Sequence, residues 1–369
     1  MTSSLSDATL SNLPESIARI AASAELRDPM DAPALRWGIL GAGLIARRFT
    51  EEVTAHTRST VAAIGARDVK RAQAFAAELD IPRAYGSYDE LIDDPEVDAL
   101  YIATINPTHH DLALRAIESG KPILVEKPFT LNAVEASAVF AAAEAKGVFI
   151  MEAMWTRFLP QFEVLRAITR GGQLGKLVNA HANFAGTMLE EIPRLVEPAQ
   201  GGGALLDIGV YSVSAIHDVI GKPEQVVAAG NLMKQHAVDA SAAIIMRTSE
   251  ALGTARSNLD GRAPSGAEFI FEHGIVDFPT DFYAPGVLRL YEFDDDGPTE
   301  ASADGVADAT VTEWDATVPG GFQFQVAEVA RCVAAGMQES EVMPYRATIE
   351  VLEIMDEARA AIGVKFPGE

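Results

Sequence analysis

The chain has 369 residues, 48% of them hydrophobic and 22% charged, which is long enough for two globular domains. Its formal net charge is −24 with no basic block, which argues against nucleic-acid and anionic-membrane partners and favours a small neutral substrate. Cys332 is the only cysteine and no histidine spacing suits a metal, so we predict no disulfide and no metal site. We find no bilayer-spanning apolar run and no secretory signal, and therefore expect a cytoplasmic protein.

Residues 1–35 are polar and acidic, with one weakly amphipathic patch from Leu13 to Leu26. We interpret them as an N-terminal extension. Two alternatives stay open, namely an arm that packs on a neighbouring subunit and a partly disordered tail.

From Arg36 to Arg157, short apolar runs alternate with helical segments. The runs are RWGIL, TVAAIGA, VDALYIAT, PILVE and VFIM. Strands that alternate with helices are typical of a parallel sheet covered on both faces. We therefore expect an α/β protein in which residues 36–157 form a doubly wound Rossmann domain.

The first of these strands is followed by Gly41-Ala42-Gly43-Leu44-Ile45-Ala46, which opens a helix. Gly41 permits a tight turn, and Gly43 lets the backbone approach a pyrophosphate. The amides at the helix start, including those of Leu44 and Ile45, are free to bind phosphate oxygens. This motif predicts a dinucleotide-binding turn.

The tip of the second strand indicates which dinucleotide binds. An acidic residue there would hold the adenosine ribose hydroxyls, but the strand ends in Gly65-Ala66-Arg67, and Lys70 and Arg71 follow. Arginine forms bidentate contacts with phosphate, so Arg67 and Arg71 favour NADP. Asp68 weakens this inference, because it could cap the next helix or pair with Arg71, and a merely solvated helical turn stays an alternative.

The stretch GKPILVEKPFT places Glu126 and Lys127 directly after a buried strand. Ligands of open parallel sheets bind beyond the carboxyl ends of the strands, so this pair faces the expected site. Pro128 restricts Lys127 to an extended conformation, and the peptide bond between them is a candidate for the cis form. The alternative is a lysine that reaches solvent beside Glu126.

Residues 158–369 have a different pattern. A helix around Gln161–Arg170, a strand at LVNAHANFAG and a helix over 204–220 precede several consecutive strand-like runs. The runs are EQVVAAGNL, ASAAIIMRT, LGTARSNL, AEFIFEHGIVDF and VLRLYEF. Strands without intervening helices predict a large, mostly antiparallel open sheet in an α+β domain for substrate binding and oligomerisation. Two last helices within 322–362 are expected to pack back toward the Rossmann domain.

Within this second region, GGGALLDIGVYSVSAIHDVI places Asp207 and Tyr211 four residues apart on one helix face. Gly209 lies inside that helix and Gly201–Gly203 precede it. Glycine in mid-helix is unfavourable, so we interpret these glycines as signs of close approach by substrate or cofactor. The alternative is a surface helix with an incidental carboxylate and a packed tyrosine.

Several separated motifs now show a family likeness. The stretches GILGAGLIA, YIATINPTHH, GKPILVEKPFTLNAVEA, MEAMWTRFLP and GGGALLDIGVYSVS resemble the glucose–fructose oxidoreductase/inositol dehydrogenase (Gfo/Idh/MocA) family. The motifs are most similar to the branch of dimeric dihydrodiol dehydrogenases and NADP-dependent D-xylose dehydrogenases. The likeness covers roughly residues 36–367.

The resemblance implies site residues position by position. Lys127 matches the lysine of the family's Glu-Lys-Pro motif, Asp207 its catalytic aspartate, and Tyr211 a position that is histidine in many sugar and inositol members. Tyrosine there is what the dihydrodiol/xylose branch has. Further residues implied beside the cofactor are Thr104, Asn106, His109, Glu126, Lys127, Trp155 and Arg157. Those implied at the substrate are Lys127, Trp155, Phe184, Asp207 and Tyr211.

The resemblance also implies hydride transfer between a substrate carbon and nicotinamide. Tyr211 is then the candidate acid/base, and its ordinary pKa near 10 suits neutral pH poorly. We predict that the ammonium of Lys127 lowers that pKa and that Asp207 orients the lysine or the substrate hydroxyl.

The function predicted is NADP-dependent oxidation of a sugar or cyclic diol, at an aldose C1 of the D-xylose type or in a trans-dihydrodiol. Two alternatives stay open: an inositol or anhydro-sugar dehydrogenase/reductase, and a non-catalytic NADP-sensing regulator. The presence of Lys127, Asp207 and Tyr211 together favours an enzyme. The expected open sheet face predicts a homodimer or larger homo-oligomer.

Overall fold

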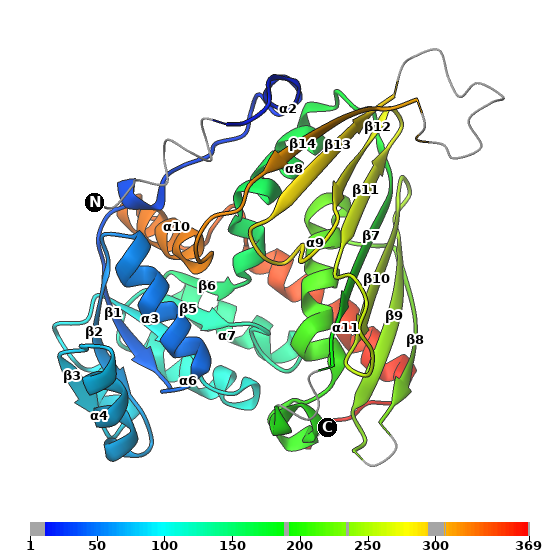
Figure 1. Cartoon of the computed structure of the whole chain (residues 1–369). Helices are drawn as coiled ribbons and strands as arrows, with labels where there is room; N and C mark the ends of the chain where they lie inside the picture. The colour runs from blue at the N-terminus through cyan, green and yellow to red at the C-terminus, as the bar shows by residue number, and fades with distance from the viewer. Residues whose placement is uncertain (1–11, 188–191, 234–235, 294–305, 307, 368–369) are drawn as a thin grey trace.

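The protein is described by a computed structural model that covers residues 12–187, 192–233, 236–293, 306 and 308–367. The described residues form a parallel sheet of six strands and a mostly antiparallel sheet of eight, with helices between them (Figure 1). The predicted α/β fold class, with a Rossmann sheet followed by an α+β region, is confirmed.

The first sheet has the strand order β3-β2-β1-β4-β5-β6, and all of its neighbouring strands are parallel. Its strands are β1 (Arg36–Leu40), β2 (Thr60–Gly65), β3 (Arg83–Tyr85), β4 (Ala99–Ile102), β5 (Ile123–Glu126) and β6 (Ile150–Ala153). Its helices are α3 (Leu44–His56), α4 (Val69–Glu78), α5 (Tyr88–Ile92), α6 (His109–Ile117) and α7 (Ala133–Lys146).

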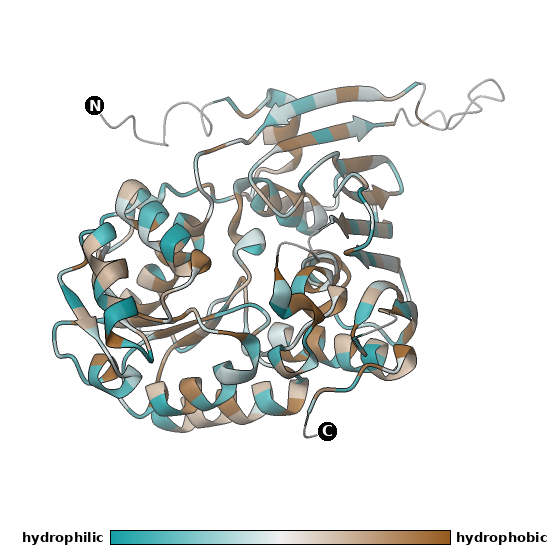
Figure 2. Ribbon diagram, turned by 60° about the horizontal axis from the view of Figure 1, so that its bottom comes forward, coloured by the Kyte–Doolittle hydropathy of each residue, from teal (hydrophilic) through white to brown (hydrophobic). Residues whose placement is uncertain are grey.

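These helices divide between the two faces of the sheet, because successive strand residues point to opposite sides. Trp37 and Ile39 of β1 pack with Phe49 of α3 and Phe75 of α4. Leu40, on the other face, packs in a cluster that includes residues of α5, α6 and α7. Figure 2 shows hydrophobic residues along the strands and hydrophilic residues on the surrounding helices.

The second sheet has the order β14-β13-β12-β11-β7-β10-β9-β8, and only the pair β10–β7 is parallel. Its strands are β7 (Leu177–Ala185), β8 (Gln225–Leu232), β9 (Asp239–Arg247), β10 (Leu252–Asn258), β11 (Ala267–Phe271), β12 (Gly274–Phe278), β13 (Val287–Glu292) and β14 (Thr310–Asp315). The strand β14 was not predicted, because its TVTEWD segment follows an acidic stretch that carries no strand signal.

Helices cover one face of this second sheet. They include α8 (Pro160–Gly171), α9 (Val210–Ile220) with a preceding π-turn η6 (Leu205–Gly209), and α11 (Tyr345–Ile362). No helix of the described chain covers the opposite face (Figure 1). On that face Val227, Ile245 and Leu252 are 52%, 44% and 38% exposed.

The last two helices connect the two regions. The helix α10 (Phe322–Ala334) contacts α3, and α11 contacts α7 as well as α9 and β8. One cluster of buried side chains runs from Trp37 and Phe49 through Trp155 to Phe278 and Trp314. The two regions therefore share a continuous core.

The N-terminal segment packs on its own chain. The short helix α2 (Glu15–Ile20) buries Ile17 and Ile20 in the common core. Arg19 pairs with Glu292 at 2.7 Å and Ser16 donates to Thr312 at 2.9 Å, which ties α2 to β13 and β14. The described part of the extension therefore contacts its own chain, while its packing on a neighbouring subunit remains a prediction; residues 1–11 lie outside the described residues.

The segment Pro198–Ile220 is long and apolar enough to cross a membrane by composition, but 83% of its most apolar window is buried inside the protein. It includes α9, which packs on β7 and β10. A core helix has these same properties.

Candidate active site

The glycine turn between β1 and α3 has the geometry predicted for a dinucleotide site. Gly41 has φ +111°, and a Cβ there would lie 2.6 Å from the carbonyl oxygen of Ala103. A Cβ on Gly43 would meet nothing within 4 Å, so the space above the start of α3 is open. Leu44 is 87% exposed and Ile45 follows it in the first turn of the helix. This open helix N-terminus fits a pyrophosphate.

The cations at the tip of β2 lie beside this turn. Arg67 is exposed, while Arg71 donates from Nε and Nη2 to the carbonyl of Ala42 at 3.1 and 2.8 Å. Asp68 caps α4 by accepting a hydrogen bond from the amide of Lys70. Of the two roles that the sequence suggested for Asp68, capping the helix and pairing with Arg71, the structure shows capping. Arg71 thus joins the first turn of α4 to the glycine turn.

At the end of β5, Glu126 is buried and its carboxylate accepts hydrogen bonds from the hydroxyl of Tyr101 and from the amide of Lys127. The Lys127–Pro128 peptide bond, which the sequence made a candidate for the cis form, is cis. Burial raises the pKa of Glu126 above its ordinary value. The carboxylate fixes the backbone from which the side chain of Lys127 projects.

Lys127, Asp207 and Tyr211 come together although 80 residues or more separate the lysine from the other two. The Nζ of Lys127 donates to the backbone carbonyl of Asp207 at 2.7 Å and lies 3.6 Å from its Oδ1. The same Nζ stands 4.8 Å from the centroid of the Tyr211 ring. A cation over an aromatic face is attracted by the ring quadrupole.

Burial and neighbouring charge set the ionisation of these three groups. Burial disfavours the charged lysine, but the Tyr211 oxygen, Asp207 and Glu126 outweigh it, so the pKa of Lys127 is raised. Burial alone would raise the pKa of Asp207, yet Lys127 and Arg194 hold it below its usual value. Burial raises the pKa of Tyr211, and the ammonium of Lys127 offsets this only in part. Lys127 therefore acts in the predicted direction, but the net shift of the Tyr211 pKa is upward because burial outweighs the ammonium.

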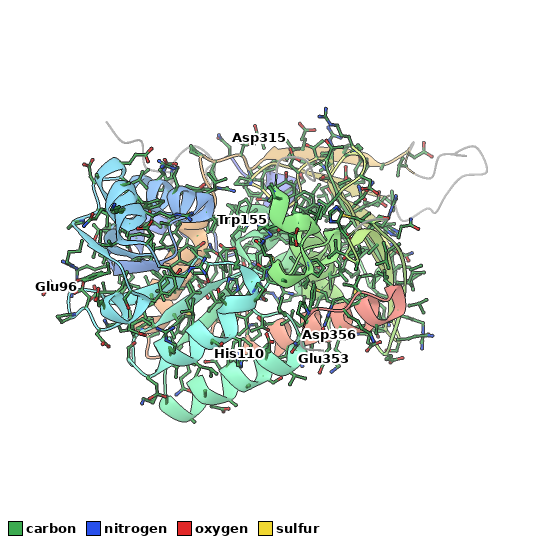
Figure 3. The ribbon with its side chains drawn as sticks, turned by 90° about the horizontal axis from the view of Figure 1, so that it is seen from below. Glu96, His110, Trp155, Asp315, Glu353 and Asp356 are labelled. Carbon is green, nitrogen blue, oxygen red and sulfur yellow. The ribbon has the colours of Figure 1, made fainter. Side chains whose placement is uncertain are left out.

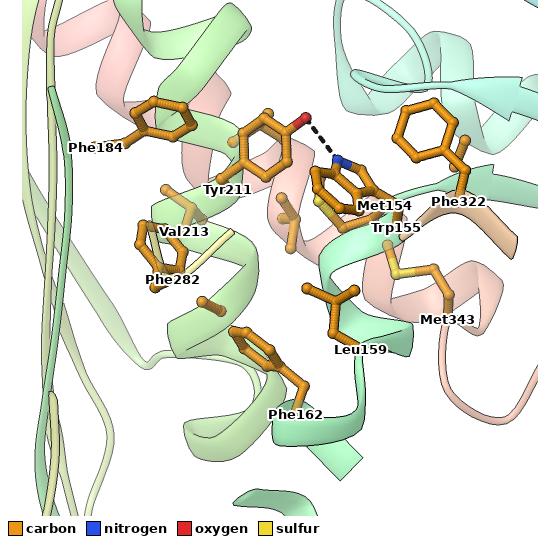
Figure 4. Close-up of a cluster of buried hydrophobic side chains, with 14 of the residues drawn as sticks. Met154, Trp155, Leu159, Phe162, Phe184, Tyr211, Val213, Phe282, Phe322 and Met343 are labelled. Carbon is orange, nitrogen blue, oxygen red and sulfur yellow. Dashed lines mark hydrogen bonds between the residues drawn. The ribbon is translucent and has the colours of Figure 1, made fainter. Parts of the chain in front are cut away.

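Aromatic side chains form the wall around Tyr211. The Nε1 of Trp155 donates to the Tyr211 hydroxyl at 3.0 Å (Figure 4). Phe184 lies 5.5 Å from the Tyr211 ring and stacks on Tyr283 at 4.0 Å, with 7° between the ring planes. Trp155 stands between the parallel-sheet region and the second region in Figure 3. The predicted neighbours Trp155 and Phe184 both lie beside Tyr211.

Thr104, Asn106 and His109 lie at the carboxyl end of β4. His109 is fully buried and its ring nitrogens contact the carbonyls of Pro128 at 3.0 Å and Thr104 at 3.1 Å. Asn106 donates to the carbonyl of Gly201 at 3.4 Å. His109 therefore braces the turn that follows Lys127, and its predicted contact with the cofactor remains a prediction.

Arg157 lies in the turn that follows β6 and packs against α9. It is 2% exposed, and its guanidinium donates to the hydroxyl and carbonyl of Ser214 at 2.8 and 3.0 Å. It also contacts His217 at 3.1 Å and Asp218 at 3.5 Å. These contacts join Arg157 to α9, and its predicted contact with the cofactor remains a prediction.

The glycines around Asp207 make room for protein rather than for a ligand. A Cβ on Gly202 would lie 2.6 Å from the carbonyl oxygen of Leu195, and one on Gly203 2.2 Å from Oδ1 of Asp239. A Cβ on Gly209 would lie 3.1 Å from the hydroxyl of Ser257 on β10. The interpretation of these glycines as points of ligand approach is therefore corrected.

Sequence reasoning missed two contributors to the site. Arg194, in the turn η4 (Pro193–Val196), donates to Oδ1 of Asp207 at 2.8 Å. Tyr283, in the connection between β12 and β13, forms part of the aromatic wall. Both lie in irregular segments without periodicity, and only the family likeness of neighbouring motifs could have drawn attention to them.

The open helix N-terminus at the end of β1, with an ammonium and a phenol beyond the end of β5 in the same parallel sheet, defines a nicotinamide-dependent oxidoreductase. Residues 35–154 match the family model described as "Oxidoreductase family, NAD-binding Rossmann fold", and residues 162–276 match the "GFO/IDH/MocA C-terminal domain". The chain belongs to the Gfo/Idh/MocA oxidoreductase family, as its motifs indicated.

Relatives of known activity cover nearly the whole chain. The trans-1,2-dihydrobenzene-1,2-diol dehydrogenase of Homo sapiens is 36% identical over 344 residues, which is 90% of this chain and 98% of the relative. The enzyme of the same name from Danio rerio is 33% identical over 338 residues, with the same coverage of both chains. The predicted likeness to the dihydrodiol branch is confirmed.

Solved structures show the same fold at lower identity. A 3-ketoreductase from Actinomadura kijaniata, in complex with NADP and TDP-benzene, has a TM-score of 0.77 at 22% identity and covers 89% of this chain and 98% of its own. A levoglucosan dehydrogenase, in complex with NADH and levoglucosan, has a TM-score of 0.78 at 17% identity and covers 90% and 98%.

Proposed function

We propose that this protein is an NADP-dependent dehydrogenase that oxidises one hydroxyl of a cyclic trans-diol, with Lys127 and Tyr211 as its catalytic residues. The observation that supports this most is the position of the Lys127 ammonium, 4.8 Å from the centroid of the Tyr211 ring and 3.6 Å from Oδ1 of Asp207. The substrate class comes from the names of two relatives, in each of which 98% of the chain is matched by this protein.

The residues divide the work of proton transfer. Bound NADP⁺ supplies a hydride acceptor for the carbinol carbon. The Tyr211 oxygen accepts a hydrogen bond from Trp155, and in its phenolate form it takes the hydroxyl proton as the carbonyl forms. Lys127 stabilises that phenolate by its charge and holds the substrate oxygen with a free N–H. Asp207 keeps the ammonium charged and in place, because its own pKa is held low.

The aromatic wall supports a ring-shaped substrate. Phe184, Tyr211 and Tyr283 lie within 6 Å of one another, and Trp155 closes the side next to the Tyr211 hydroxyl. Aromatic faces of this kind favour a flat apolar ring with polar groups at one edge. A trans-diol on a cyclohexadiene has this distribution of polar and apolar surface.

The choice of NADP is supported by Arg67 and Arg71. Arg71 is fixed at the glycine turn through Ala42, and Arg67 is exposed at the tip of β2. Neither position at this strand end carries the acidic residue that would repel a 2′-phosphate. The exposed guanidinium of Arg67 is the proposed partner of that phosphate.

A spectrophotometric screen tests the proposal by following NADPH formation. The purified protein is offered trans-dihydrodiols, aldoses including D-xylose, inositols and anhydro-sugars with NADP or NAD. We expect the highest kcat/KM with a trans-dihydrodiol and NADP. A clear preference for an aldose, inositol or anhydro-sugar would replace the substrate class. Tight NADPH binding without turnover of any substrate would favour a regulator.

We also propose a homodimer in which the open faces of the eight-stranded sheets meet, and a cytoplasmic location. Val227, Ile245 and Leu252 on that face support the dimer, because exposed apolar sheet faces favour association. Light scattering should give twice the chain mass of 39.3 kDa, and Ile245→Asp should reduce it to the monomer value. The single cysteine suits a reducing compartment.

A further inference from the structure

Asp207 is shared between two cations. Its Oδ1 lies 2.8 Å from Nη2 of Arg194 and 3.6 Å from Nζ of Lys127, so the shorter ion pair is the one with the arginine. Lys127 makes its shorter contact, 2.7 Å, with the backbone carbonyl of the same residue. The carboxylate is therefore held by the arginine and kept at some distance from the ammonium.

The fold holds Arg194 in place through the glycines before the π-turn. The amide of Gly203 donates to the carbonyl of Leu195 at 2.9 Å. A Cβ on Gly202 would come within 2.6 Å of the carbonyl oxygen of Leu195 and 2.9 Å of that of Arg194, so the backbone of η4 packs directly on this glycine. The glycine run thereby sets the distance between the turn that carries Arg194 and the helix that carries Asp207.

Arg194 stabilises the buried Asp207 carboxylate by pairing with it, but one of its own nitrogens is left unpaired within the described part of the chain. Its Nη1 is buried and has no hydrogen-bond partner among the described residues. A buried donor without an acceptor is unfavourable and is uncommon in folded proteins. Retaining such a guanidinium beside a buried carboxylate is easier to understand if the carboxylate needs it for the reaction.

We propose that Arg194 is a positioning residue: it holds the Asp207 carboxylate away from Lys127, so that the ammonium keeps donors free for Tyr211 and the substrate oxygen. This inference rests on the proposed function. Without the guanidinium, the carboxylate would close on Lys127, the other cation that acts on it among the described residues. The resulting ion pair would draw the ammonium away from the Tyr211 ring.

Charge gives this role a distinct signature. The groups that act on Lys127 are the Tyr211 oxygen, Asp207, Glu126 and Arg194, and Lys127 in turn acts on His109. The positive charge of Arg194 lowers the pKa of Lys127 and that of Asp207. Removal of that charge should therefore move the titration of the coupled Lys127–Tyr211 pair to higher pH.

The test compares Arg194→Met and Arg194→Lys with the full-length wild type. For Arg194→Met we expect kcat for diol oxidation at neutral pH to fall at least about tenfold, and the pH–kcat profile to move to higher pH by roughly one unit. Arg194→Lys keeps the charge and should keep the wild-type profile with a smaller loss of kcat. Arg170→Met is the matched control, because Arg170 is 61% exposed and lies 3.4 Å from Glu163 on the surface.

A second readout does not depend on turnover. Ultraviolet titration of tyrosinate, taken as the difference between proteins with Tyr211 and with Tyr211→Phe, should show the same displacement in Arg194→Met. A uniform loss of kcat at all pH values with an unmoved tyrosinate titration would overturn the inference. If the wild type oxidises no diol, the proposed function fails, and the tyrosinate titration still decides the effect of Arg194.

Discussion

The two halves of the site are built in different ways. The glycine turn and the Glu126–Lys127 pair lie at the carboxyl ends of β1 and β5, which β4 separates in the same parallel sheet, and each is set by a few consecutive residues. The other half joins Asp207 and Tyr211 on a π-turn and helix to Arg194 in a short turn and to Tyr283 in a loop. The first half depends on backbone geometry, and the second depends on side chains that meet only in the folded protein.

This difference has a physical consequence. Backbone turns at strand ends are fixed by local φ/ψ preferences and by the sheet, so they tolerate changes elsewhere. The second half contains buried charges that must be paired to be stable. Substitutions there are expected to change protonation and rate, and those at the glycine turn to change cofactor binding.

The largest effect is expected from the residues at which the two halves meet. Lys127→Met should abolish measurable diol oxidation while NADPH still binds, because the cation above the Tyr211 ring is lost. Steady-state kinetics and NADPH fluorescence titration measure the two quantities. Near-normal turnover in this variant would count decisively against the mechanism.

A comparable loss is expected for Tyr211→Phe. Removing the phenol oxygen should lower kcat by roughly 10²- to 10⁴-fold, the usual contribution of a general acid or base. Folding should be unaffected, since the phenyl ring keeps its contact with Phe184. Retained activity would transfer the acid/base role to Lys127 or Asp207.

In the first half, Arg67→Ala should raise the KM for NADP by roughly 10- to 100-fold, the usual effect of losing a charged hydrogen bond. The KM for NAD should change little, because NAD lacks the 2′-phosphate. The measurement is the ratio of the KM for NADP to the KM for NAD, compared between Arg67→Ala and the wild type. Equal effects on both cofactors would refute the assignment of Arg67.

In the second half, Trp155→Phe tests the hydrogen bond to the Tyr211 hydroxyl. Burial raises the pKa of Tyr211, and the Trp155 N–H opposes this, so its loss should raise that pKa further. Oxidation needs the phenolate, so its rate should rise with pH in the wild type and only at higher pH in Trp155→Phe. Carbonyl reduction needs the phenol and should show the opposite dependence. A pH–rate profile identical to that of the wild type would show that Trp155 does not act on Tyr211.

A smaller effect is expected from Glu152 on β6, whose carboxylate accepts from the amide of Phe129 at 3.1 Å. Burial raises its pKa from 4.5 to about 7, so the folded state binds the extra proton between these values. Its contribution to stability is complete below pH 4.5 and is lost as the pH rises through 7. Glu152→Gln should therefore show a smaller fall in Tm between pH 5 and pH 8 than the wild type. A larger fall in Tm for Glu152→Gln than for the wild type would contradict the raised pKa of Glu152.

The same division decides what could be predicted from the sequence. The glycine turn, the strands of the first sheet and the position of Lys127 follow from local patterns, and the structure places them as expected. The pairing of Asp207 with Arg194 could not be predicted, because it depends on the packing of η4 against Gly202. The direction of the Tyr211 pKa was missed for a related reason: burial, which sequence does not reveal, outweighs the ammonium.

The central claim is that Lys127 and Tyr211 act together on one substrate oxygen. A crystal structure of the protein with NADP and an unreactive analogue of a trans-diol tests it most directly. The account predicts one diol oxygen within hydrogen-bond distance of both the Lys127 Nζ and the Tyr211 hydroxyl, with its carbon facing the nicotinamide. An analogue whose oxygens contact neither group while the nicotinamide is in place would contradict it.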